Sequence, residues 1–347
     1  MDIDAKKNRW RQFYDIGSDT KTLVLIDYPH PNRPLPYAEN FEARLQWAYE
    51  SYQKQLSDAE FLRDDRVPAL SPYTGTELFA GAFGCAVHYS GDDMPFALPL
   101  IQNASEIRLL REPDIFSGRL GDVFELARRL QQKNGNGAIF QLPDIQSPFD
   151  IAALIWEKSD FFAAMAVDPP AVKELVRMTE NTLTRFLSEW FKEFGTEFIA
   201  HYPDYYMDGG VTVSEDEIGV FGPSMFREFC LPVLNRLSER FGGIGIHCCA
   251  NAEHQWDNLK KISGLRLLNF VQPPDTTFRA YRVFADTAAM MHIWCGEEQP
   301  SAGWVNNYPA DAHVVLNCFA SDRDDAVRKC EILREVSELR RNERINH

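Results

Sequence analysis

Short apolar runs alternate with helical stretches from Arg66 to about Leu339, and this alternation constrains the fold more than any other feature of the chain. Such an alternation is typical of a parallel sheet covered by helices. The chain lacks a glycine-rich phosphate-binding fingerprint, so the pattern favours a (β/α)8 barrel over a dinucleotide-binding fold. The predicted strands are 67–70, 138–142, 197–201, 243–249, 265–270, 290–295 and 313–318, and the main predicted helices are 148–156, 170–194, 224–241, 251–262, 277–284 and 322–339.

The first sixty residues are more mixed and polar than the rest of the chain. Residues 22–27 could form a short strand, the proline-rich stretch 28–36 cannot be regular structure, and 41–55 has the apolar spacing of a helix. The sequence therefore predicts an α/β protein with two parts. Residues 1–60 form an N-terminal arm or helical cap, and residues 61–347 form a (β/α)8 TIM barrel.

Two of the predicted strands end in side chains that bind soft metals. Residues two apart on a strand point to the same side, so His247 and Cys249 face together while Cys248 faces away. Cys318 ends the last predicted strand, and the carboxyl ends of barrel strands share one face. One imidazole and two thiolates make a three-ligand zinc site with an open position, which is typical of a catalytic zinc. The alternative is that these are ordinary buried residues, since cysteine is often buried.

Other polar side chains are expected on the same face. Cys295 or His254 could be a fourth ligand, although a packed thiol and a solvated histidine are the simpler interpretations. The segment after the predicted fourth strand offers candidates for substrate contact or acid–base catalysis, and the segment after the third offers candidates for cofactor binding. The catalytic candidates are Asp204, Tyr206 and Asp208, and the cofactor-binding candidates are Asp144 and Gln146. Both segments could equally be ordinary loops.

The bulk properties exclude several classes of function. A formal net charge of −15 argues against nucleic acid as a partner, because phosphate binding needs basic surfaces. No apolar run has the length of a membrane span, and the charged N-terminus lacks the apolar core of a signal peptide, so we expect a cytoplasmic protein. The seven cysteines are scattered and odd in number, unlike a disulfide framework. The sequence does not indicate an oligomeric state.

Several short motifs, taken in order, resemble those of the uroporphyrinogen decarboxylase superfamily. The resemblance covers roughly residues 60–340 and implies a (β/α)8 barrel, in agreement with the alternation of strands and helices. The motifs are Asp65-Arg66-Val67-Pro68, Glu77-Leu78-Phe79-Ala80-Gly81-Ala82-Phe83-Gly84, Gln146-Ser147-Pro148-Phe149-Asp150-Ile151-Ala152, Val167-Asp168-Pro169-Pro170, Ser214-Glu215-Asp216-Glu217 and Gly222-Pro223-Ser224-Met225-Phe226-Arg227-Glu228.

The superfamily has two main chemistries, and the resemblance implies one of them more strongly. The true decarboxylases need no metal and carry an arginine-rich motif of the form R-Q-A-G-R-Y, whereas residues 67–77 of this chain contain neither arginine nor lysine. The zinc-dependent methyltransferases carry H-x-C and a distant cysteine, which His247, Cys249 and Cys318 resemble. The resemblance then implies Zn²⁺, methylcobalamin on a partner corrinoid protein, and a small thiol-type methyl acceptor. The alternatives are a metal-free decarboxylase and a non-catalytic module that binds a corrinoid or tetrapyrrole.

Overall fold

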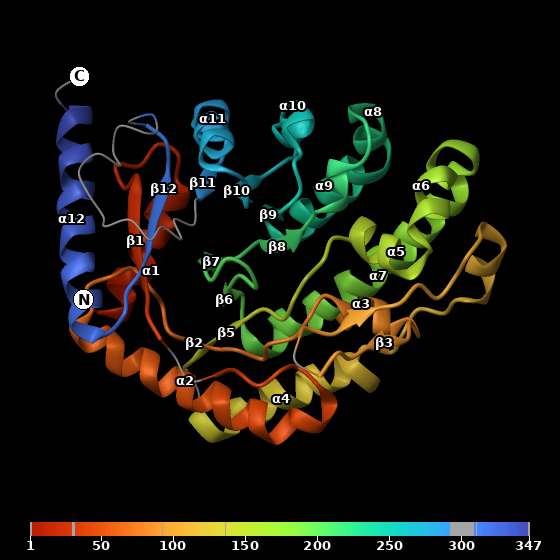
Figure 1. The fold of residues 1–347 in the computed structure, drawn as a ribbon, viewed down its shortest axis with the longest axis horizontal. Coiled ribbons are helices and arrows are strands. Elements are labelled where there is room, and N and C mark those ends of the chain that lie inside the picture. Colours follow the sequence, from red (N-terminus) through yellow and green to blue (C-terminus); the bar gives the residue numbers. More distant parts are fainter. Residues whose placement is uncertain are drawn as a thin grey trace.

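The computed structural model describes residues 2–29, 32–91, 93–135, 137–291, 309 and 311–345. Strands form an inner layer and helices lie outside them (Figure 1). The strands are β1 Thr22–Asp27, β2 Ala69–Leu70, β3 Val87–His88, β4 Phe96–Ala97, β5 Ile139–Gln141, β6 Glu197–Ile199, β7 Tyr206–Asp208, β8 Val211–Ser214, β9 Ile244–Cys248, β10 Leu265–Phe270, β11 Ala289–Met291 and β12 Val314–Phe319.

The helices vary widely in length, and the longest, α7, has a clear sequence origin. Asp168 accepts a hydrogen bond from the backbone N–H of Ala171, and proline occupies the first helical turn, as the sequence predicted. The helices are α1 Ile3–Tyr14, α2 Phe41–Phe61, α3 Glu77–Ala82, α4 Gly118–Asn134, α5 Pro148–Ile155, α6 Lys158–Val167, α7 Pro169–Phe194, α8 Pro223–Met225, α9 Leu231–Phe241, α10 Trp256–Leu259, α11 Pro274–Phe284 and α12 Arg323–Ile345, with a π-helical turn at Phe226–Cys230 between α8 and α9.

The strands of the inner layer pair mainly as parallel ladders in three arcs, and β3 and β4 form a separate antiparallel pair. One arc has the order β11-β10-β9-β8, the second β2-β5-β6-β7 with β7 antiparallel, and the third joins β1 to β12. A parallel bridge between Gln146 and Ser214 links the first arc to the second. The fold is thus a mixed α/β architecture of the TIM-barrel type, although the described ladders do not by themselves close a continuous ring.

The N-terminal segment contributes a strand to this inner layer. β1 pairs with β12 in parallel from Thr22 beside Val314 to Asp27 beside Phe319. Its residues 22–26 are all buried, as an apolar run predicts for a parallel strand with both faces covered. The expected strand at 22–27 is therefore confirmed. The proposed boundary at residue 60 separates it from its pairing partner, and the division into two domains stays a prediction.

A buried carboxylate joins β1 to the segment before β2. The carboxylate of Asp65, which is fully buried, accepts a hydrogen bond of 2.8 Å from the backbone N–H of Val24. Its negative charge is balanced by Arg9 at 2.7 Å and by Arg334 of α12 at 3.0 Å. A buried backbone N–H group needs an acceptor, which in a sheet is usually supplied by a neighbouring strand. For Val24 the side chain of Asp65 supplies it instead.

Most of the predicted elements are present, with differences at three places. The predicted helix at 251–262 is shortened to α10. The segment 202–210, for which an ordinary loop was one of two interpretations, contains β7, and β8 follows it directly. Of the strand predicted at 290–295, residues 290–291 belong to β11, and the remainder lies outside the described residues. Within the described part of the chain, no helix is both long enough and apolar enough to cross a membrane.

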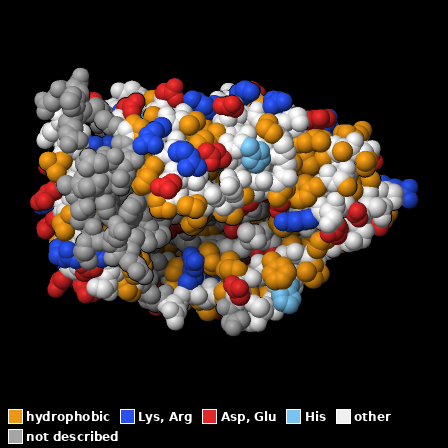
Figure 2. All heavy atoms as spheres, turned by 45° about the horizontal axis from the view of Figure 1, so that its top comes forward, with side chains coloured by type: hydrophobic (Ala, Val, Ile, Leu, Met, Phe, Trp, Pro, Cys, Tyr) orange, Lys and Arg blue, Asp and Glu red, His pale blue; other side chains and the backbone are white. Residues whose placement is uncertain are grey.

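Charged side chains of both signs lie on the surface of the molecule. Figure 2 shows one face of the molecule, where acidic, basic and apolar side chains are interspersed. The described residues on that face form no continuous basic patch, which phosphate-backbone binding would need.

Candidate metal centre and its cleft

An open cleft lies at the ends of several strands of the inner layer. Its volume is about 570 Å³, within the range of small-molecule sites. The described residues that line it are Arg33, Tyr73, Thr74, Thr76, Met94, Gln141, Leu142, Asp144, Gln146, His201, Tyr202, Asp204, Ser214, Asp216, His247, Cys249 and Val271.

β9 brings His247 into the cleft in a defined orientation. Asn269 lies opposite His247 in the ladder of β9 and β10, and the histidine Nδ1 is 2.6 Å from the Asn269 Oδ1. An amide oxygen only accepts, so Nδ1 carries the proton and Nε2 keeps its lone pair. The ring of Tyr202 packs against the imidazole edge to face, with centroids 4.6 Å apart. His247 therefore presents Nε2 as a ligand atom.

Three ligand-type side chains converge at this point. One ligand atom each from Asp216, His247 and Cys249 lies within 4.8 Å of the other two. An Asp216 carboxylate oxygen accepts a 2.6 Å hydrogen bond from the backbone N–H of Cys249. The loop that carries Asp216 is held in turn by Asp150, whose carboxylate accepts from the Asp216 N–H at 2.6 Å. Imidazole, thiolate and carboxylate are all ligands that zinc accepts.

Cys318, the third predicted ligand, does not join this cluster, so the expected set of His247, Cys249 and Cys318 is not assembled. Cys318 is fully buried. Burial raises the pKa of its thiol. Its Sγ lies 3.7 Å from the backbone carbonyl oxygen of Phe319, which also accepts a 2.7 Å hydrogen bond from Lys329 of α12. Residues one apart on a strand face opposite sides, so a difference of one position is enough to turn the ligand away from the cleft.

The two candidates for a fourth ligand have different outcomes. Cys295 lies outside the described residues. His254 does not line the cleft, since its Nε2 is 2.9 Å from the backbone carbonyl oxygen of Phe221. Within the described residues, the candidate metal cluster is limited to the three side chains already named.

The two residues predicted to bind a cofactor do line the cleft. The Gln146 Nε2 donates a 2.6 Å hydrogen bond to Asp144 Oδ1, and the Asp144 backbone N–H donates to the hydroxyl of Thr74. Burial raises the pKa of the Asp144 carboxyl to about 6, with a smaller contribution from the negative charge of Asp216. The His201 imidazole lies 4.0 Å from the same carboxylate. Asp144 is thus able to hold a proton near neutral pH.

The three predicted catalytic residues separate into two groups. Asp204 lines the cleft and accepts a 2.6 Å hydrogen bond from Gln141. Tyr206 and Asp208 do not line it, because they lie on β7, which runs back antiparallel to β6. Tyr206 donates to Glu197 at 2.8 Å, and Asp208 accepts from Arg11 of α1 at 2.5 Å. These two residues attach α1 to the inner layer, so the prediction that they flank the cleft is wrong.

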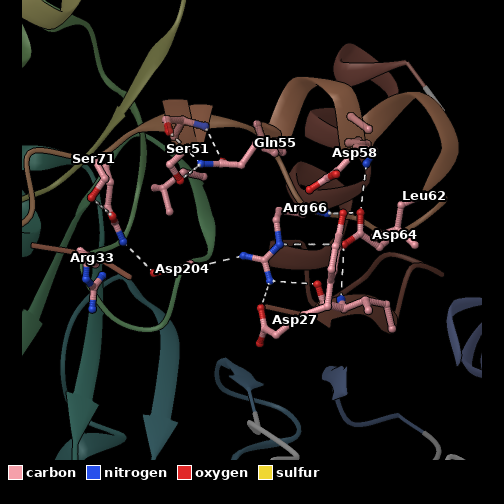
Figure 3. Close-up of a pocket in the computed structure, with 18 of the residues that line it drawn as sticks. Asp27, Arg33, Ser51, Gln55, Asp58, Leu62, Asp64, Arg66, Ser71 and Asp204 are labelled. Atoms are coloured by element: carbon pink, nitrogen blue, oxygen red, sulfur yellow. Dashed lines mark hydrogen bonds and ion pairs between the residues drawn. The ribbon is translucent and has the colours of Figure 1, made fainter. Parts of the chain in front are cut away.

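A smaller cavity of about 180 Å³ adjoins the cleft, and both are lined by Arg33, Gln141 and Asp204. Figure 3 shows Arg66 at the centre of this cavity, with dashed lines to the carboxylates around it. Its guanidinium pairs with Asp27, lies 3.8 Å from Asp204 and lies 4.0 Å from Asp64. The positive charge of Arg66 is therefore balanced within the protein.

Several of these residues have only weak signals in the sequence. Asp216 lies in a run of three acidic residues that resembles a helix start, and Arg33 lies in a proline-rich stretch with no periodic pattern. Next to the cleft wall, Glu77 is 3% exposed and has one carboxylate oxygen without a partner among the described residues. Burial raises the pKa of Glu77 to about 7, although Arg119 lies 4.0 Å away.

Comparison with known proteins agrees with this architecture. The family model of uroporphyrinogen decarboxylase (URO-D) matches residues 73–290, which is more than half of the chain. The chain therefore belongs to the uroporphyrinogen decarboxylase family. Among solved structures it is similar to a methyltransferase from Methanosarcina mazei, with 11% sequence identity, a TM-score of 0.62, and coverage of 96% of this chain and 98% of that one. A comparison with curated protein sequences found no match.

Proposed function

We propose that the protein is a zinc-dependent methyltransferase that transfers a methyl group between a corrinoid protein and a thiol-type acceptor. The observation that carries the proposal is the convergence of Asp216, His247 and Cys249 at an open cleft of about 570 Å³. The fold supports it as well, because a solved methyltransferase has the same architecture over nearly its whole length.

The donor set fits zinc on two grounds. One nitrogen, one sulfur and one oxygen ligand suit an ion of borderline softness, whereas calcium and magnesium select oxygen alone. Metal-binding histidines almost always donate their second ring N–H to an acceptor, and His247 does this through Asn269 at 2.6 Å. Three protein ligands leave a position for substrate, which is the arrangement of catalytic zinc sites.

Each residue of the candidate site has a separate role in the proposed reaction. Asp216, His247 and Cys249 would hold the metal, and Asn269 fixes which nitrogen of His247 faces it. Zinc, when bound, lowers the pKa of a thiol acceptor so that a nucleophilic thiolate is present at neutral pH. Asp150 accepts a hydrogen bond from the backbone N–H of Asp216 and so helps to position this ligand.

The remaining parts of the proposal concern partners and location. The methyl group comes from methylcobalamin carried by a separate corrinoid protein, and the acceptor is a small molecule that enters the cleft. The protein acts in the cytoplasm. Nucleic acid has no part in this proposal, consistent with the net charge of −15.

The experiment that tests the function uses the purified protein, methylcobalamin and a panel of thiols. Absorbance follows demethylation of the cobalamin, and mass spectrometry identifies the methyl thioether. We expect activity that a chelator abolishes and that added zinc restores. Demethylation that continues at full rate after complete metal removal contradicts the proposal. Tight binding of the corrinoid without turnover of any thiol would instead indicate a binding module.

A second candidate, a metal-free decarboxylase, is favoured by one observation. Asp144 has a pKa of about 6 inside the cleft, so it holds a proton in part near neutral pH. After a carbon–carbon bond breaks and CO₂ leaves, such a carboxyl can protonate the carbon that retains the electron pair. Decarboxylation that survives a chelator and is lost in Asp144→Asn would establish this function in place of methyl transfer.

A further inference from the structure

A second pocket lies at the opposite end of β1 from the cleft, where α1, β1 and α12 lie side by side (Figure 1). Thr22, the first residue of β1, lines this pocket, whereas Asp27, the last, lines the small cavity that adjoins the cleft. The volume of the pocket is about 690 Å³, which is enough for a small molecule. The pocket is therefore separate from the candidate metal centre.

Basic side chains outnumber acidic ones in this pocket. The described residues that line it include five lysine and arginine residues and three carboxylates, whereas those of the cleft include one arginine and three aspartates. In a chain with a net charge of −15 the pocket is a local positive region, and a concave surface strengthens such a field. We call it the basic pocket, after Arg9, Lys21, Arg334, Arg340 and Arg341.

The arrangement of Arg9 and Arg334 explains part of the excess positive charge. Both guanidiniums pair with one carboxylate, that of the fully buried Asp65, at 2.7 and 3.0 Å. Arg9 also donates to the carbonyl oxygen of Thr22, and Arg334 donates to that of Arg63. These contacts use the Nε and Nη2 groups and hold both side chains in place. The Nη1 group of each arginine donates no hydrogen bond to a described residue.

The other three cations add positive charge to the same pocket. Arg341 is exposed and forms no ion pair with a described residue. Lys21 lies 2.7 Å from the Nε2 of His313, and Arg340 donates to the carbonyl oxygen of Ala312 at 2.7 Å. Burial lowers the pKa of His313 to about 4, so both of these acceptors are uncharged at neutral pH. The two contacts therefore leave the positive charges of Lys21 and Arg340 in place.

The carboxylates of the basic pocket are less favourably placed than its arginines. They belong to Asp15, Asp19 and Glu338, and all three residues are exposed. The side chains of Arg9 and Arg334 are only 31% and 21% exposed. Water and salt screen exposed charges more strongly than partly buried ones. A multivalent anion should therefore be attracted to the two arginines more strongly than the three carboxylates repel it.

We propose that the basic pocket binds a compact multivalent anion of the phosphate class, such as a phosphate or diphosphate ester, independently of the proposed methyl transfer. Arg9 and Arg334 donate to phosphate oxygens through their remaining N–H groups, and Arg341 contributes further positive charge. A planar guanidinium suits this ligand because its N–H groups can donate to two oxygens of one phosphate. Because these arginines belong to α1 and α12, the bound anion connects helices from the two ends of the chain.

The test measures binding of inorganic phosphate and pyrophosphate to the full chain by phosphorus NMR, with sodium chloride at matched ionic strength as the comparison. We expect binding at millimolar concentrations or below, and tighter binding of pyrophosphate because of its higher charge. The thermal unfolding temperature should rise with pyrophosphate and should not rise with chloride. The variant His247→Ala, in the candidate metal centre, should bind pyrophosphate as the wild type does. Loss of binding in this variant would place the anion in the cleft and overturn the proposal.

Variants of the basic pocket assign the binding to its side chains. Arg341→Gln removes an exposed charge and should weaken pyrophosphate binding by about threefold, and Arg9→Gln, which removes a charge-assisted donor, by about tenfold or more. Arg177→Gln, at an exposed arginine of α7, is the matched control and should change nothing. Unfolding in urea checks that each variant is folded. An absence of binding by the wild type, or equal binding by the wild type, Arg341→Gln and Arg9→Gln, would overturn the proposal.

Discussion

Replacing Asn269 with alanine should weaken zinc binding without disturbing the ligands themselves. Asn269 is fully buried, and its side-chain oxygen lies 2.6 Å from the Nδ1 of His247. In the variant, Nδ1 has lost this acceptor, and the imidazole is no longer held in the tautomer that leaves Nε2 free. The loss of such an outer partner typically lowers metal affinity about tenfold to hundredfold, which is about 1.4–2.7 kcal/mol.

The assay is a competition between the protein and a chromophoric chelator of known zinc affinity. Asn269→Asp retains the acceptor, so its affinity should equal or exceed that of the wild type. Asn258→Ala is the matched control, because Asn258 is also buried but donates to the carbonyl of Pro223 at 3.0 Å, outside the cleft lining. An unchanged zinc affinity in Asn269→Ala, or an equal loss in Asn258→Ala, would refute the reasoning.

Three further outcomes follow from the structure. Asp65→Ala leaves the Val24 N–H without its acceptor and removes a buried charge between two arginines. The free energy of unfolding measured by urea denaturation should fall by about 3 kcal/mol, and a decrease below about 1 kcal/mol would contradict this. Because burial raises the pKa of Glu77 from 4.5 to about 7, the folded state binds this proton more tightly than the unfolded chain, and the contribution of Glu77 to stability falls as pH rises through that window. Glu77→Gln should therefore be more stable than the wild type by up to about 3 kcal/mol at pH 8 and equally stable near pH 4, and a pH-independent difference in urea midpoints would show the assignment to be wrong. Tyr206→Phe should lower the free energy of unfolding by about 1 kcal/mol and leave the rate of methyl transfer unchanged. A large loss of activity at unchanged stability would show instead that Tyr206 acts in the active site.

Local signals in the sequence predicted much of the fold. The strand at 265–270 has the predicted bounds, since an apolar run between turn residues marks both of its ends. The start of α7 was also predicted, because capping by Asp168 depends only on the next three residues. The sequence did not predict β7 and β8, and this also has a physical reason. β7 and β8 are short, and they are defined by partners on β6 and β9 rather than by their own pattern.

The residues of the candidate site could be predicted from the sequence only in part. His247 and Cys249 were predicted to face together because the period of a strand fixes their relationship. Asp216 was missed because a residue 66 positions earlier, Asp150, holds its loop. Cys318 was predicted at the site because it lies near the end of a correctly predicted strand, but which of the two faces of that strand its side chain occupies depends on the packed structure. The cleft position of Arg33 depends on Tyr73 and Trp47, and no periodic pattern reports such a contact.

The most direct test of the central claim is the zinc content of four proteins purified without chelator: the wild type, Asp216→Ala, Cys249→Ser and Cys318→Ser. The account predicts about one zinc ion per chain in the wild type and in Cys318→Ser, and a large loss in the other two variants. Zinc that is absent from the wild type, or that is lost in Cys318→Ser and retained in Asp216→Ala, would contradict it.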